Sequence, residues 1–83
     1  MTLPSQPVTL TVEQIEELNQ KLADVRHDVN NHLSLMIAAV ELMRHTPHTA
    51  ERMMDTLSER PPKISQSLIA FSGDFEKTLG ITR

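Results

Sequence analysis

A short polar cluster in the first half of the chain carries the residue types that chemistry needs. His27 and Asp28 are adjacent, and Asn30 and Asn31 follow within about one helical turn. An imidazole changes charge near neutral pH and presents a nitrogen lone pair, so His27 is the candidate nucleophile. Because asparagine favours caps and turns over helix interiors, two in a row indicate a role other than helix formation.

The residues that follow leave room for a partner beside this imidazole. Ser34 and Ala38 have small side chains, and Ile37 adds apolar surface next to them. A smooth strip beside an exposed histidine is what a docking partner needs. The alternative is an ordinary solvated helix face. We expect docking over four residues: Asn30, Ser34, Ile37 and Ala38.

The segment Arg26-His27-Asp28-Val29-Asn30-Asn31-His32-Leu33 resembles the H-box of sensor histidine kinases. That box lies on the first helix of their dimerisation and histidine-phosphotransfer (DHp) domain, and the resemblance extends over residues 11–80. It implies that His27 is the phosphoacceptor, Asp28 the orienting acid or base, and Asn31 a residue that positions water for a phosphatase reaction. His32 replaces the proline common in that family. Its position on the helix predicts a core histidine rather than a ligand.

A long helix must carry this cluster. Thr11 can cap its start, with Gln14 reaching back to the cap and Leu10 packing on Ile15. Apolar residues then recur every three or four positions, and no glycine or proline interrupts them before about His45. The helix should therefore be on the order of 50 Å long. The apolar positions are 15, 18, 22, 25, 29, 33, 36, 40 and 43.

A second helix of similar length follows a short turn. Thr46 suits a cap, and Pro47 suits the first helical turn after it. The second apolar stripe keeps its phase across Pro61 and Pro62, which a loop would have no reason to do. We therefore expect one helix, kinked at the proline pair, rather than two helices, with Gly80 as its C-terminal cap.

These elements predict an all-α fold, an antiparallel helical hairpin over residues 11–80. Residues 1–10 form a flexible lead-in and residues 81–83 a C-terminal tail. A chain of 83 residues with 39% hydrophobic residues, two phenylalanines and no cysteine buries too little surface to be comfortably stable alone. A lone hairpin also leaves half of each apolar seam exposed, so we expect two copies to close a four-helix bundle.

Composition excludes several function classes. The net charge of −3, with acids and bases interspersed, does not favour nucleic acid or an anionic membrane surface. No basic, apolar leader is visible and no apolar run approaches about 18 residues, so we expect a cytoplasmic protein. Gly73 and Gly80 are the only glycines, which leaves no glycine-rich phosphate loop in this sequence, and we expect no ATP-binding domain to follow it. We expect no autonomous kinase activity and no cofactor or metal bound by this chain.

These observations together predict a stand-alone histidine phosphotransfer module of a two-component system or phosphorelay. His27 would carry a phosphoryl group between a separate kinase or receiver domain and a response-regulator aspartate. Mg²⁺ is expected on that partner domain. One alternative is a non-catalytic interaction protein that binds receivers or histidine kinases through the same face. Another is a structural helical dimer with a decayed motif.

Overall fold

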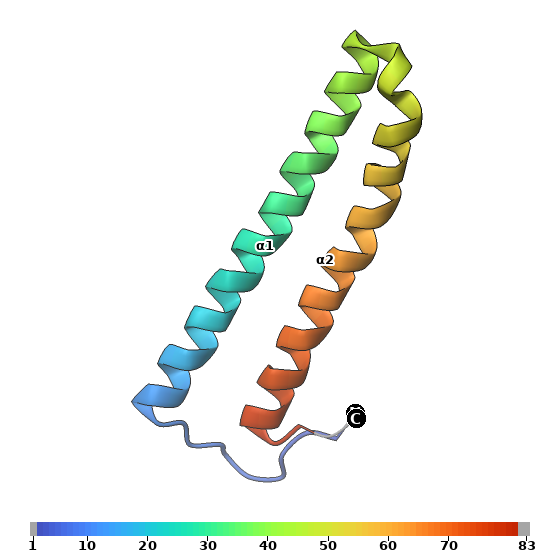
Figure 1. Ribbon diagram of the computed structural model, residues 1–83. Helices are drawn as coiled ribbons and strands as arrows, with labels where there is room; N and C mark the ends of the chain where they lie inside the picture. Colours follow the sequence, from blue (N-terminus) through green and yellow to red (C-terminus); the bar gives the residue numbers. More distant parts are fainter. Residues whose placement is uncertain (1, 82–83) are drawn as a thin grey trace.

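The computed structural model describes residues 2–81, and these form a helical hairpin (Figure 1). Helix α1 spans Val12–His45, a 3₁₀ turn η1 spans Pro47–Thr49, and helix α2 spans Ala50–Leu79. The two helices lie side by side and antiparallel, and the lead-in crosses the end of the hairpin opposite the turn (Figure 1). The predicted all-α hairpin is confirmed. Of the predicted tail, positions 82–83 lie outside the described residues, as does position 1.

Helix α1 begins at the cap that the sequence predicts. The Thr11 hydroxyl accepts the backbone N–H of Gln14 at 3.1 Å, and the Gln14 side chain accepts the backbone N–H of Thr11 at 2.9 Å. This capping box satisfies two of the N–H groups that a helix start leaves unpaired. The helix ends at His45. Its last turn contains Arg44 and His45, and the helix dipole favours basic residues at this end.

The turn differs in detail from the expectation. Thr46 makes no side-chain capping hydrogen bond, and Pro47 opens the 3₁₀ turn instead of an α-helical one. The Thr49 hydroxyl donates to the Thr46 carbonyl at 2.7 Å and closes this turn. The α-helix therefore begins at Ala50, because the local hydrogen bonds of the turn use the residues that would have formed its first turn.

Helix α2 is continuous through both prolines, as predicted. Because proline has no N–H, Pro61 and Pro62 leave the carbonyls four residues earlier without helical donors. The kink expected at this pair stays a prediction. Gly80 ends the helix in the left-handed conformation at φ 73°, which suits glycine because it lacks a Cβ atom.

The hairpin is only one helix thick. Its principal dimensions are 58 × 25 × 12 Å, so no second layer covers the helices. Among the described residues only Ala39 and His32 are buried, and both lie between the two helices. The predicted burial of His32 is therefore confirmed. A single layer of this kind cannot enclose a hydrophobic core.

The predicted apolar seam of α1 is split lengthwise. The seam residues that face α2 are half-buried. A second row of seam residues, turned away from α2, has side chains that are between 43% and 53% exposed. A matching row on α2 leaves Met54, Leu68 and Phe75 exposed to 54%, 49% and 39%. We call the two rows together the apolar face. It consists of Ile15, Leu22, Leu33 and Val40 on α1 and Met54, Leu68 and Phe75 on α2.

Both rows of the apolar face lie on the same side of the hairpin. Leu33 and Val40 line a groove that Leu57 completes from α2. Leu68 follows Leu57 by eleven residues and Phe75 follows it by eighteen, and both intervals are close to whole helical turns. Neither helix of the described part of the chain is long and apolar enough to cross a membrane.

Candidate functional site

His27 is exposed near the middle of α1. It follows Leu22 by five residues and precedes Leu33 by six. At about 100° per residue, this turns His27 by roughly 120–140° from the apolar face around the helix axis. Ala39, buried between the helices, follows His27 by twelve residues and so lies about 120° around the axis on the other side. The imidazole therefore points away from both α2 and the apolar face, as the sequence predicts for a residue outside the seam.

The predicted docking strip lies on the same exposed side. Asn30, Ser34 and Ala38 are all exposed, and so is Asn31, one turn after His27. Ile37 is 65% exposed and also borders the groove formed with Leu57, so it lies at the edge of the apolar face. The docking strip is thus a continuous exposed surface of α1.

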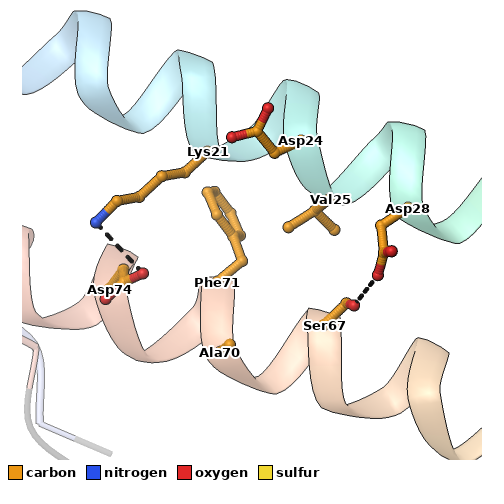
Figure 2. Close-up of a pocket in the computed structure, with 8 residues that line it drawn as sticks. All are labelled: Lys21, Asp24, Val25, Asp28, Ser67, Ala70, Phe71 and Asp74. Carbon is orange, nitrogen blue, oxygen red and sulfur yellow. Dashed lines mark hydrogen bonds and ion pairs between the residues drawn. The ribbon is translucent and has the colours of Figure 1, made fainter.

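Asp28 points in a different direction from His27. Its carboxylate lies over α2, where one oxygen accepts a hydrogen bond from the Ser67 hydroxyl (Figure 2). The other oxygen lies 3.7 Å from Nε2 of His32, one turn further along α1. Consecutive side chains leave a helix about 100° apart. In this arrangement the Asp28 carboxylate is directed toward Ser67 and His32, and its described contacts are with these two residues.

Arg60 extends this chain of polar contacts through the hairpin. Its Nη1 lies 3.3 Å from Nδ1 of His32. A guanidinium can only donate, so Nδ1 must accept, and the proton of neutral His32 is placed on Nε2, facing Asp28. Within the described part of the chain, Nε of Arg60 is buried without a hydrogen-bond partner. We call Arg60, His32, Asp28 and Ser67 the polar chain.

A shallow groove of about 380 Å³ adjoins the polar chain (Figure 2). Lys21 bridges it, with Nζ 3.4 Å from Asp74 on α2 and 3.2 Å from Glu17 on α1. The hydrogen bond to Glu17 first, and then the contacts with Asp74, raise the pKa of Lys21 above its ordinary 10.5. The groove is lined by Lys21, Asp24, Val25, Asp28, Ser67, Ala70, Phe71 and Asp74.

Three partners of the site on α2 were not predicted from the sequence: Arg60, Ser67 and Asp74. A usable signal was present, because these three residues are spaced by seven along α2. Lys21 and Asp28 have the same spacing on α1. In an antiparallel hairpin such matched spacing lets two pairs form at once but leaves the register open, and the structure pairs Lys21 with Asp74 and Asp28 with Ser67.

The described residues contain no group of three or more potential metal ligands in reach of one ion. Carboxylate oxygens of Glu41 lie 3.5 Å from Nη1 of Arg44 and 3.5 Å from Nε2 of His45. Comparisons with protein families, with curated proteins and with solved structures found no match.

Proposed function

We propose that this protein is a histidine phosphotransfer module of a two-component system or phosphorelay, with His27 as the phosphoacceptor. The observation that supports this proposal best is the exposure of His27 on a side of α1 turned away from α2 and from the apolar face. A phosphoryl donor can approach this imidazole without opening the hairpin. As a relay component the protein would act in the cytoplasm.

The transfer needs only one nucleophile from this chain. A ring nitrogen of neutral His27 uses its lone pair to attack the phosphorus of a receiver aspartyl phosphate in line with the leaving oxygen. The P–N bond forms while the P–O bond to the aspartate breaks, and the proton stays on the other ring nitrogen. Transfer onward to a response-regulator aspartate is the reverse, and the receiver's own Mg²⁺ stabilises the charge.

Asn31 supports the same reaction type. It lies four residues after His27, and residues with this spacing are neighbours on a helix surface. Its amide can hold a water molecule beside a phosphorylated aspartate of a docked receiver. We therefore include a receiver phosphatase reaction in the proposal, with the docking strip as the surface that binds the receiver.

We further propose that two copies pair through the apolar face to form a four-helix bundle. Seven large apolar residues lie on this one side of a layer 12 Å thick. Covering them removes apolar surface from water, at about 25 cal/mol per Å². Pairing at this face leaves both His27 side chains uncovered, because they point away from it.

The test is phosphoryl transfer from receiver domains charged with acetyl phosphate, and separately from histidine kinases supplied with ATP. We expect acid-labile phosphate on His27 of the wild-type protein, located by mass spectrometry at neutral pH, and none on His27→Gln. His45→Gln is the matched control, since His45 is also exposed on α1, and it should be phosphorylated like the wild type. A proposal of phosphotransfer fails if no donor modifies His27.

One observation favours the alternative of a non-catalytic interaction protein. The Asp28 carboxylate is held by Ser67 and His32 of the polar chain, which leaves His27 without a described acidic partner. A protein that only sequesters receivers or histidine kinases needs the docking strip but not the imidazole. In that case His27→Gln would bind a receiver as tightly as the wild type does.

A further inference from the structure

The polar chain joins the candidate site to the interior of the hairpin. Asp28 belongs to both, because it is adjacent to His27 in sequence and yet directs its carboxylate toward α2 (Figure 2). His32 is 8% exposed and stands between Asp28 and Arg60. Loss of one of these contacts is therefore expected to change the direction of the Asp28 carboxylate relative to the His27 ring.

Donor chemistry fixes the direction of the two hydrogen bonds in the polar chain, while the contact between Asp28 and Nε2 of His32, at 3.7 Å, is longer than a hydrogen bond. Arg60 has only donors, so Nδ1 of His32 accepts and its Nε2–H faces Asp28. The hydroxyl of Ser67 donates to the second Asp28 oxygen. One oxygen of the carboxylate thus accepts from Ser67 on α2, the other lies near Nε2 of His32 on α1, and neither has a described contact with the imidazole of His27.

We propose that Arg60, His32 and Ser67 are positioning residues that hold Asp28 against α2 and so withhold it from His27. The positioning of Asp28 does not depend on the proposed function, whereas its effect on phosphotransfer rests on that function. Released from Ser67, the carboxylate can turn toward the His27 ring, accept a hydrogen bond from one nitrogen and make the other more nucleophilic. The hairpin therefore keeps His27 in a less reactive state.

The first test needs no phosphoryl chemistry. In the full chain, ¹⁵N NMR of the imidazoles at pH 8 should find His32 with its proton on Nε2 and a bare Nδ1. Arg60→Met removes the donors at similar length and should give a mixture of both tautomers. A proton on Nδ1 in the wild type, or an unchanged tautomer in Arg60→Met, would overturn the inference.

The second test measures the nucleophilicity of His27 with diethyl pyrocarbonate, which acylates neutral imidazoles. Ser67→Ala should raise the acylation rate of His27 by at least about threefold, relative to His45 and His48 in the same molecule. Ser65→Ala, on an exposed serine of the same helix, is the matched control and should leave the rate unchanged. Adding Asp28→Asn to Ser67→Ala should abolish the increase.

Phosphoramidate then links the inference to the proposed function. It transfers its phosphoryl group to an imidazole nitrogen as the P–N bond to ammonia breaks, and Ser67→Ala should speed this reaction like the acylation. Faster acylation with no phosphate on His27 would refute the proposed function and leave the positioning intact. Phosphorylation of His27 with neither rate changed by Ser67→Ala would refute the positioning and leave the proposed function intact.

Discussion

At the scale of single residues, charged and polar side chains join the two helices at three places. Lys21 meets Asp74, Asp28 meets Ser67, and His32 meets Arg60. These pairs fix the register of the hairpin better than apolar contacts can, since each donor must find its own acceptor. Their energies are modest, because most of these groups remain partly in water.

The bridge made by Lys21 predicts how stability depends on pH. Because Glu17 and Asp74 raise its pKa in the folded state, the contribution of Lys21 is fully present below the unfolded value and is lost as pH rises through the folded one. We expect the stability difference between wild type and Lys21→Met to be constant up to about pH 10 and to shrink above it. Urea denaturation between pH 8 and 12 measures this difference, and shrinkage already at pH 8 would contradict it.

Two adjacent alanines provide a matched test of the helix–helix contact. Ala39 is 3% exposed between the helices, whereas Ala38 is exposed on the docking strip. Ala39→Leu should lower the free energy of unfolding by about 1–3 kcal/mol through overpacking. Ala38→Leu should change it by less than about 0.5 kcal/mol. Equal losses in urea denaturation would show that the two helices do not meet at Ala39.

At the scale of elements, each helix starts and ends for local reasons, and packing then decides how the helices lie. The cap of α1 is complete within four residues, and Gly80 ends α2 by its own conformation. By contrast, α2 is continuous through Pro61 and Pro62 although proline opposes helix formation by about 3 kcal/mol. The segments on both sides of the prolines contact α1, through Arg60 with His32 and Ser67 with Asp28.

The capping box of α1 gives a prediction at this scale. Thr11→Ala removes the hydroxyl that accepts the N–H of Gln14 and should cost about 1 kcal/mol. In a domain of this size that corresponds to a melting temperature lower by about 4–8 °C. Thr9→Ala, in the lead-in before the helix, should leave the melting temperature unchanged. Equal effects of the two substitutions in calorimetry would contradict the cap.

At the scale of the whole molecule, the hairpin has too little interior for its apolar content. Two buried residues among those described cannot balance the conformational entropy of two helices of 34 and 30 residues. The apolar face supplies the missing surface if a second copy covers it. Such pairing would explain how a chain of 83 residues without cysteine is stable.

Pairing through the apolar face predicts a dimer whose stability depends on concentration. Light scattering at micromolar concentration should give twice the mass of the chain, and the melting temperature should rise with concentration. Leu68→Lys, within the apolar face, should produce monomers and lower the melting temperature. Ile69→Lys is the matched control, because Ile69 is 71% exposed but about 100° further around α2. A folded wild-type monomer would refute the bundle.

Much of the fold could be predicted from the sequence. The bounds of α1, the cap at Thr11, the glycine cap at Gly80 and the continuity of α2 all depend on residues within a few positions of one another. The burial of His32 could also be predicted from its place in the apolar repeat. The start of α2 could not, because Pro47 fits the first turn of either an α-helix or a 3₁₀ turn.

The sequence by itself determined the two helices, the position of His27 outside the apolar seam and its polar neighbours. Each of these depends on local helix propensity and on the helical period of the residues, and both can be read from the sequence alone. Only the tertiary structure decided which half of the seam faces α2, and that Asp28 lies against Ser67, 39 positions away. Such contacts depend on the rotation and register of two packed helices, which no local pattern specifies.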